Sequence, residues 1–457
     1  DVATSQLGAS IREKDTNDYL DQVFLEKEGM RSGIVPYIQY LAGTQGTPNS
    51  AEFNRLSKQL IGLVGKARKK VALLYTELGT LLQSMGQGQG EYDLNMRITP
   101  AVRALPAWAD VTGICENLTD VLEDISKLLQ EIDRDIDDLS VNETIRFQMT
   151  TLINLGQELK EQICSVVLRQ DDNSICWLTL GRKNNIITLH SAPLEVGPLL
   201  KSHLYLRLDT MVLTGATLTT NDNFNFIRSR LGLDDVQERH LDSPFDYQNA
   251  SLIYLVDDIP QPGANGYYEA LGRALVSLCG AAQGRSLILF TSYAALRQVK
   301  EAIVDKLMTQ DILVLGHGID GSPRKLLAFL QQNPRTVILG TSSFWEGIDV
   351  AGEALSVLGI VRLPFNVPSD PVFAARSETF RNPFNEYALP LAASKFKQGF
   401  GRLIRTKTDR GIMVVLDSRL SKKEYGKMFL KSLPSCGVEK GTIHNIPQAV
   451  QSWLGVK

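Results

Sequence analysis

Apolar residues at helical spacing dominate the chain between about residues 15 and 165. They recur every three or four positions along residues 53–81, 118–139 and 149–163. This spacing places them on one face of a helix, with polar side chains on the other faces. Three amphipathic helices of this kind predict a small helical bundle.

The pattern changes near residue 175 from a helical period to alternation. Apolar and polar positions alternate around the polar turn 181–185, which predicts a β-hairpin with one strand on each side of the turn. A helix over residues 196–205 and a strand over residues 210–213 are predicted to follow.

From about residue 250 onward, short apolar runs alternate with amphipathic stretches. Strands are predicted over residues 251–256, 286–290, 312–315, 336–339, 355–360 and 411–416, and helices over residues 267–281, 296–307 and 325–330. Runs that are apolar throughout suit strands buried on both faces, so this region predicts a parallel sheet in an α/β fold. In such a sheet the functional residues follow the carboxyl ends of the strands.

Composition excludes several classes of protein. The 457 residues are 43% hydrophobic and 22% charged, as in ordinary globular proteins and unlike disordered or collagenous chains. The five cysteines show no CxxC spacing, so we expect reduced thiols and no metal site. No apolar run reaches the roughly 18 residues needed to span a bilayer. We therefore expect a cytoplasmic protein with no membrane contact.

The net charge of −3 is the sum of two unlike regions. Residues 116–138 carry nine carboxylates against two basic side chains, which we interpret as the solvated face of a helix. Residues 395–431 carry eleven basic side chains against three acidic ones, a net charge of +8. This basic region favours an anionic partner, either a nucleotide or a nucleic acid.

One candidate site directly follows the predicted strand 336–339. The hydroxyls of Thr341 and Ser342 suit contacts to phosphate, and the segment continues to Glu346, Gly347 and Asp349. The two carboxylates suit hydrogen bonds from a ribose or from arginines. An ordinary glycine-rich connection with a helix N-cap remains an alternative for this segment.

A second candidate site lies in residues 398–405, which contain Gln398, Gly401, Arg402 and Arg405. We expect the two arginines to share one face of a helix because they are three positions apart. A guanidinium is permanently charged and makes bidentate contacts to phosphate. Such arginines can neutralise charge on a γ-phosphoryl group during its transfer.

These segments together resemble the motifs of superfamily 2 helicases, in the variant of the DinG/XPD family. Residues 340–349 resemble motif V and residues 398–405 resemble motif VI. Motif III is similar to Thr214, Gly215, Ala216 and Thr217, and motif IV is similar to residues 289–293, with Thr291 and Ser292. Residues 363–371 and the aspartate-x-arginine segment Asp417 to Arg419 also resemble this family.

The resemblance implies a fold and an order of domains. Residues 1–14 resemble the stretch after an Asp-Glu-Ala-His box, at the end of a first motor domain. Residues 15–165 would then be a helical arch-like insertion, and residues 166–235 the remainder of the first motor domain. Residues 236–457 would form a second RecA-like motor domain with motifs IV, V and VI. We accordingly expect the chain, which starts at Asp1, to be the carboxy-terminal part of a longer protein.

The resemblance also implies an activity, that of an ATP-dependent DNA helicase moving 5′→3′ on single-stranded DNA. Gln398, Arg402 and Arg405 would act on ATP, while Glu346, Gly347, Asp349 and Gly401 would bind the nucleotide. Thr291, Ser292, Thr341 and Ser342 would hold the DNA strand, and residues 214–217 would couple the two events. The expected cofactors are ATP and Mg²⁺, the expected partner is single-stranded or forked DNA, and the expected state is a monomer.

The sequence departs from the family in three ways. It contains neither the Gly-x-x-x-x-Gly-Lys-Ser/Thr phosphate loop nor the Asp-Glu-Ala-His box, and it has no iron–sulfur ligands. Gly215 stands where the family usually has serine. We therefore expect this chain alone to be inactive. The alternatives are a nucleic-acid-binding module without motor activity and part of a DinG-type exonuclease that does not unwind DNA. A metabolic nucleotide-binding enzyme is disfavoured because no catalytic cluster converges and only five histidines occur.

Overall fold

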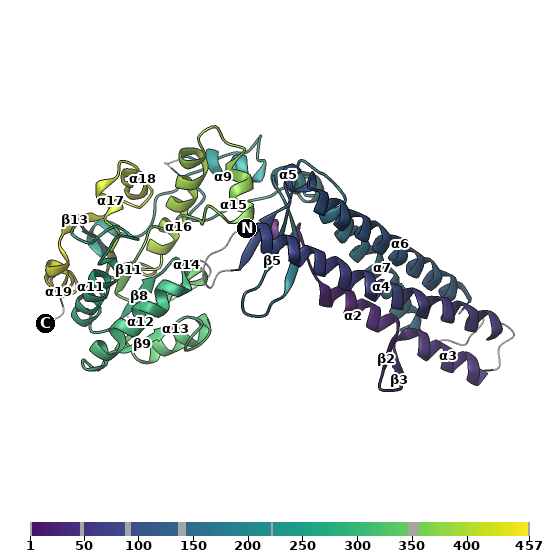
Figure 1. Cartoon of the computed structure of the whole chain (residues 1–457). Coiled ribbons are helices and arrows are strands. Elements are labelled where there is room, and N and C mark those ends of the chain that lie inside the picture. Colours follow the sequence, from purple (N-terminus) through teal and green to yellow (C-terminus); the bar gives the residue numbers. More distant parts are fainter. Residues whose placement is uncertain are drawn as a thin grey trace. The chain divides into compact units, whose positions relative to one another are not determined.

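The computed structural model describes residues 2–45, 50–86, 93–135, 143–220, 223–345 and 355–455. The chain forms two compact units (Figure 1). The first unit comprises Asp1–Val196 together with Val367–Arg376, and the second comprises Gly197–Asn366 together with Ser377–Lys457.

The first unit is mainly helical. Its helices are α1 (Val2–Gln6), α2 (Glu13–Val23), α3 (Ile34–Gln45), α4 (Ser50–Met85), α5 (Pro100–Arg103), α6 (Pro106–Asp135), α7 (Glu143–Val167) and, from the later segment, α15 (Pro371–Ser377). Its strands are β1 (Ala9–Arg12), β2 (Leu25–Lys27), β3 (Met30–Ser32), β4 (Leu94–Arg97), β5 (Ser174–Leu180) and β6 (Ile187–Pro193).

The long helices α4, α6 and α7 pack side by side and share one core with a small sheet (Figure 1). The sheet is antiparallel, with strand order β1-β6-β5-β4. Leu74 of α4, Leu122 of α6 and Leu178 of β5 belong to the same buried cluster. The apolar stripes read from the sequence therefore meet in one hydrophobic core, as the helical period requires.

The second unit alternates strands and helices. Its strands are β7 (Ser251–Val256), β8 (Ser286–Leu289), β9 (Leu313–Gly316), β10 (Thr336–Gly340), β11 (Val357–Ile360), β12 (Gly411–Val415) and β13 (Gly437–Gly441). Its helical elements are α8 (Gly197–His203), η2 (Tyr205–Arg207), α9 (Asn225–Leu231), α10 (Tyr247–Ala250), α11 (Tyr267–Ala281), α12 (Tyr293–Met308), α13 (Pro323–Gln332), α14 (Ser342–Trp345), η3 (Phe384–Ala388), α16 (Leu389–Phe400), α17 (Arg419–Lys422), α18 (Gly426–Lys431), η4 (Ile443–Asn445) and α19 (Ile446–Leu454).

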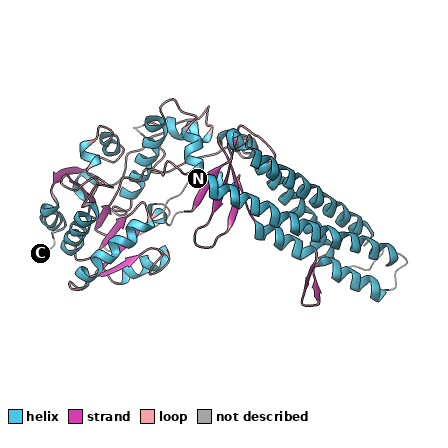
Figure 2. Ribbon diagram, in the orientation of Figure 1, coloured by secondary structure: helices cyan, strands magenta, loops and turns pink. Residues whose placement is uncertain are grey.

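The strands of the second unit form one parallel sheet, drawn in magenta in Figure 2. Their order is β13-β7-β12-β11-β8-β10-β9. Successive residues of a strand face opposite sides, so Ile412 packs in the cluster with α11, α12 and α19 while Met413 packs with α13 and α16. Helices thus cover both faces, which explains why the strands are apolar throughout. The predicted α/β fold with a parallel sheet is confirmed.

The compact units group the chain differently from the four predicted segments. The predicted arch-like segment 15–165 shares its unit with residues up to Val196, and residues 197–235 lie in the second unit. The predicted strand over residues 210–213 is wrong, because the structure has no regular element there. Val212 is 81% exposed and Leu213 is 45% exposed, so this apolar run is not buried as a strand of the sheet would be.

The acidic run on α6 faces solvent where the structure describes it. Glu116, Asp120, Asp124 and Glu131 are exposed, and Glu123 pairs with Lys160 of α7 at 2.7 Å. The remainder of the run, beyond residue 135, lies outside the described residues. Among the helices that the structure describes, none has the length and apolar content to cross a bilayer.

Candidate nucleotide and nucleic-acid site

Three neighbouring strands of the second unit end at the same edge of the sheet. β10 lies between β8 and β9, and all three run in parallel. The ladder continues just past the strands, since Phe290 N–H donates to Gly340 O and His317 N–H donates to Leu339 O. The residues that follow each strand are therefore held side by side. These residues include the predicted motif IV and motif V hydroxyls.

The predicted strand-binding residue Thr341 is buried, with 2% of its surface exposed. Its Oγ1 lies 2.8 Å from Nδ1 of His317. Ser342 and Ser343, the next two residues, are exposed at the start of α14. The hydroxyls that can reach a ligand in this segment are thus those of the two serines, and Thr341 is bonded internally.

The motif IV hydroxyls also differ from each other in environment. Thr291 is exposed, whereas Ser292 is half-buried at the N-cap of α12. Ser292 Oγ accepts a hydrogen bond from Ala295 N–H at 3.3 Å, which satisfies one of the free amides at the helix start. Thr291 is therefore the more available of the two for a ligand.

Trp345 connects motifs IV, V and VI. Its indole Nε1 donates to Phe290 O at 3.2 Å, and its own carbonyl accepts from Nη2 of Arg402 at 3.1 Å. Gly399 packs beneath the indole ring, where an added Cβ would lie 3.1 Å from Trp345 Cζ3. The three motifs are thus in direct contact around one buried indole, and the glycine leaves room for it.

The expectation that Arg402 and Arg405 share a helix face is wrong. α16 ends at Phe400, Gly401 is its C-cap, and Arg402 lies in the turn that follows. Arg405 lies in a loop, where its backbone N–H donates to Asp409 Oδ2 at 2.7 Å. Thr406 donates to the same carboxylate through its N–H and its hydroxyl, so one acidic side chain closes the loop.

Gln398 is a predicted site residue with an unsatisfied polar atom. Its Oε1 is buried and has no hydrogen-bond partner among the residues that the structure describes. A buried amide oxygen without a hydrogen-bond partner is energetically unfavourable. The neighbouring Lys397 Nζ donates to Thr219 Oγ1 at 3.2 Å, two residues beyond the predicted motif III. Within the second unit, Thr214, Gly215 and Ala216 are exposed and non-helical, and Thr217 is half-buried.

The predicted nucleotide-binding residues Glu346, Gly347 and Asp349 lie outside the described residues. Gly401, the fourth of that group, has ordinary helical geometry, and an added Cβ would meet only backbone oxygens at 3.5 Å. Its glycine identity is therefore not required by packing.

The aspartate-x-arginine segment forms a buried ion pair. Arg419 donates from Nε to Asp417 Oδ1 at 2.9 Å and from Nη2 to Oδ2 at 2.6 Å. Asp417 Oδ2 also accepts the backbone N–H of Leu363 at 2.9 Å. The pair therefore fixes the start of the proline-containing segment after β11, and its hydrogen bond raises the pKa of Arg419.

Trp345 and His317 lie at this edge and were not among the predicted site residues. His317 directly follows β9 and is 9% exposed, and burial lowers the pKa of its imidazole. The rule that functional residues follow strand ends applies to it as it does to Thr341. The sequence alone did not indicate His317, because it is a single histidine outside the recognised motifs.

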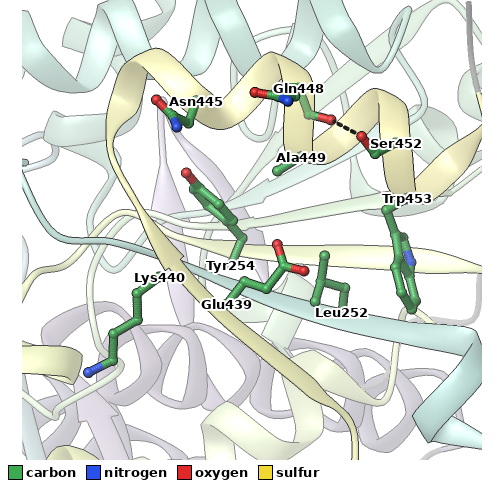
Figure 3. Close-up of a pocket in the computed structure, with 9 residues that line it drawn as sticks. All are labelled: Leu252, Tyr254, Glu439, Lys440, Asn445, Gln448, Ala449, Ser452 and Trp453. Atoms are coloured by element: carbon green, nitrogen blue, oxygen red, sulfur yellow. Dashed lines mark hydrogen bonds between the residues drawn. The ribbon is translucent and has the colours of Figure 1, made fainter.

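A pocket of about 310 Å³ lies elsewhere in the second unit, between β7, β13 and α19 (Figure 3). Tyr254, Glu439 and Trp453 line it, and Tyr254 Oη donates to Thr442 O at 3.1 Å. None of the predicted site residues lines this pocket. The predicted hydroxyls of motifs IV and V lie instead at the edge of the sheet where β8, β9 and β10 end, which we call the strand-end edge.

Comparison with known proteins finds similarity in the carboxy-terminal part of the chain. Residues 275–436 match the family model of the helicase C-terminal domain. The chain is 35% identical over 284 residues to the 3′-5′ exonuclease DinG of Bacillus subtilis, which covers 60% of this chain and 30% of that protein. It is 38% identical over 251 residues to the ATP-dependent DNA helicase YoaA of Haemophilus influenzae, covering 54% and 39%.

A third relative is the ATP-dependent helicase DinG of Mycobacterium tuberculosis (strain ATCC 25177 / H37Ra), which is 37% identical over 274 residues, covering 58% of this chain and 40% of that protein. The matched part is thus well under half the length of each of these relatives. Two solved structures share the fold over 96% of the chain. They are Xpd4 of S. tokodaii, with a TM-score of 0.51 at 13% identity, covering 73% of that chain, and apo XPD, with a TM-score of 0.54 at 16% identity, covering 74%.

The motifs, the relatives and the parallel sheet agree. Residues 275–436 match the helicase C-terminal domain family, and the chain is similar to DinG and YoaA proteins over part of its length, in agreement with the predicted resemblance to the DinG/XPD family.

Proposed function

We propose that the chain is the carboxy-terminal part of a DinG-like, ATP-dependent DNA helicase that couples ATP hydrolysis to 5′→3′ movement on single-stranded DNA. The observation that carries this proposal is the contact of motifs IV, V and VI around Trp345. A change at Arg402 of motif VI can reach the residues that follow β8 through Trp345, whose carbonyl accepts from Arg402 and whose indole donates to Phe290. Such a connection is what coupling between a nucleotide and a strand requires.

In this proposal ATP and Mg²⁺ are shared with an upstream segment that carries the phosphate loop. Arg402, Arg405 and Gln398 face the γ-phosphate, and the permanent charge of the guanidinium groups neutralises charge on the phosphoryl group during transfer. The basic region 395–431 supplies the positive potential that draws in nucleotide and DNA phosphates. Glu346, Gly347, Asp349 and Gly401 would contact the nucleotide.

Thr291, Ser342 and their neighbours would hold single-stranded or forked DNA by its phosphates, which gives little sequence preference. The segment Thr214 to Thr217 lies close in sequence to Thr219, the partner of Lys397, so it is suited to sense the state of α16. We further propose a cytoplasmic protein, in agreement with the free cysteines, and a monomeric state.

The test compares Arg405→Ala with Lys440→Ala, at an exposed basic residue of β13 outside the basic region 395–431, in the complete gene product. Loss of the Arg405 guanidinium should reduce DNA-stimulated ATP hydrolysis by about 10³-fold and leave DNA affinity within about threefold, while Lys440→Ala stays near wild type. Near-normal hydrolysis by Arg405→Ala would reject the proposed action of Arg405 on the γ-phosphate. The isolated chain should hydrolyse no ATP, and DNA-stimulated hydrolysis by it would contradict the proposed sharing of the nucleotide site.

A second candidate is favoured by one relative. The Bacillus subtilis protein, 35% identical, is named a 3′-5′ exonuclease. On that alternative the chain is part of an exonuclease that binds nucleic acid and does not unwind it. Strand displacement from a forked substrate, measured with the complete gene product and ATP, separates the two. Digestion of labelled single strands without displacement would support the exonuclease.

A further inference from the structure

His317 joins groups that follow three different strands of the parallel sheet. Its Nδ1 lies 2.8 Å from Thr341 Oγ1, after β10, and 3.1 Å from Tyr293 Oη, after β8. Its Nε2 lies 3.4 Å from Oγ of Ser343. The ring itself packs against Tyr293 and Phe344, with centroid separations of 5.3 and 5.2 Å.

The loop that carries His317 is fixed on both sides. Asp320 accepts the backbone N–H of Gly316 and pairs with Lys300 of α12. Gly318 has a φ of +74°, and an added Cβ would lie 3.0 Å from the ring of Tyr293. The imidazole therefore cannot move away without disturbing the tyrosine and the ion pair.

Three hydroxyls surround His317, more than its two ring nitrogens can bond at the same time. A neutral imidazole offers one donor and one acceptor, one at each nitrogen, in the plane of the ring. Thr341 and Tyr293 compete for Nδ1, while Ser343 at 3.4 Å and Tyr293 at 3.5 Å are both at the long end of hydrogen-bond distance from Nε2. Because Thr341 is 2% exposed, its hydroxyl depends on the imidazole. The hydroxyls of Tyr293, which is 39% exposed, and of Ser343 can turn to a ligand.

We propose that His317 is a positioning residue for a phosphodiester strand, which it serves by holding Thr341 through Nδ1 and presenting the hydroxyls of Tyr293 and Ser343 to the backbone phosphates. This inference rests on the proposed function, since it takes the strand-end edge as the nucleic-acid site. It adds to that site an uncharged residue, because His317 acts by orienting hydroxyls and supplies no positive charge.

A neutral positioning role has a distinct signature in salt titrations. Each lysine or arginine that contacts a phosphate adds close to one unit to the slope of log affinity against log salt for duplex DNA, and about 0.7 for single strands. Removing His317 should lower the affinity and leave this slope unchanged. Loss of a direct cationic contact would lower both.

The experiment measures binding of the chain to a fluorescent oligothymidylate by anisotropy, at pH 7.5 and several KCl concentrations. His317→Phe keeps the ring packing against Phe344 and Tyr293 and removes both nitrogens. His317→Gln keeps a donor and an acceptor. His444→Gln, at an exposed histidine, is the control. Thermal unfolding checks that each variant is folded.

We expect His317→Phe to weaken binding by about 5–10-fold, the effect of one or two lost hydrogen bonds, with an unchanged salt slope. His317→Gln should recover binding to within about threefold of wild type, a rescue that packing alone cannot explain. Thr341→Val should cause a similar loss, and the double variant His317→Phe with Thr341→Val should lose little more than either single one.

Wild-type affinity in His317→Phe, or a reduced salt slope, would overturn the positioning role while leaving the proposed function intact. If His317→Phe does not fold, the Gln rescue and Thr341→Val decide the question, and normal binding by Thr341→Val would overturn it. Failure of the wild-type chain to bind the oligonucleotide would reject both the positioning role and the nucleic-acid site on this chain.

Discussion

The backbone N–H of Arg405 donates to the carboxylate of Asp409 at 2.7 Å, so one acidic side chain closes the loop that carries this arginine. Burial alone would raise the pKa of Asp409, but the hydrogen bonds from Thr406 and from the two backbone amides outweigh it and lower that pKa. The folded loop thus favours the ionised form of the Asp409 carboxylate.

Replacing Asp409 should loosen this loop. Asp409→Ala removes the acceptor for the N–H groups of Arg405 and Thr406, and we expect a loss of about 1–3 kcal/mol in the free energy of unfolding. Amide hydrogen exchange at Arg405 and Thr406 should accelerate most. Because the pKa is lowered on folding, this contribution exists above the unfolded pKa and fades as pH falls through the folded one. Asp305→Ala, at an exposed carboxylate of α12, is the control and should change neither quantity.

Replacing Arg419 alone should destabilise the protein more than replacing both members of the buried ion pair Asp417–Arg419. Arg419→Met leaves the Asp417 carboxylate, whose side chain is 0% exposed, without its bidentate partner. We expect a cost of about 3–5 kcal/mol, measured by urea unfolding of the chain. The double variant Asp417→Asn with Arg419→Met should recover part of that loss, since no charge is then buried alone. A double variant less stable than Arg419→Met would contradict this account.

Two glycines of the motifs should differ in their tolerance of alanine. At Gly340 an added Cβ would lie 2.5 Å from Cγ of the buried Phe344, so Gly340→Ala should cost about 1–3 kcal/mol through overpacking. At Gly401 the Cβ would meet atoms no closer than 3.5 Å, so Gly401→Ala should leave the melting temperature unchanged. Any loss of ATP hydrolysis in Gly401→Ala can then be assigned to the nucleotide site. Equal melting temperatures for both variants would contradict the packing argument.

His190 should make the first unit sensitive to mild acid. Burial lowers the pKa of His190 to about 4, and the imidazole stacks on Trp177 at 4.8 Å. The unfolded chain takes up the proton near pH 6.5, so the stability that depends on neutral His190 is present above pH 6.5 and is lost as pH falls towards 4. Allowing for partial exposure, we expect about 1–2 kcal/mol.

His190→Phe keeps the stacked ring and removes the titrating group. The difference in unfolding free energy between wild type and this variant should therefore grow between pH 6.5 and 4 in favour of the variant. A difference that is independent of pH would rule out His190 as the cause. Titrating carboxylates affect both proteins alike and cancel in the comparison.

The helices and strands that could be predicted are those whose own residues show a clear pattern of apolar and polar positions. β7 and α11 have the predicted bounds, because a fully buried strand and an amphipathic helix each mark their own ends in the sequence. β1 and β4 were missed, since each has only four residues and pairs with a strand far along the chain. The edge strand β13 was missed because Val438, Glu439 and Lys440 are exposed and give no apolar run.

The candidate site was predictable where a motif names the residues, and less so where tertiary contacts decide their roles. Thr341 and Ser342 were both predicted from the same run, yet one is buried against His317 and the other is exposed. Arg405 was placed on a helix because its spacing from Arg402 suits one, but α16 ends at Phe400 before either arginine. The sequence pattern carries no information on where Asp409 closes the loop.

The ten residues Val367–Arg376 count with the first unit although the chain on both sides of them counts with the second. Arg376 is 5% exposed and donates to the carbonyls of Pro193 and Leu194 and to the hydroxyl of Thr4. The polypeptide therefore crosses between the units three times. A protease nick between residues 197 and 366 would leave the two pieces held together by this segment, so neither unit can be produced as one uninterrupted stretch of the gene.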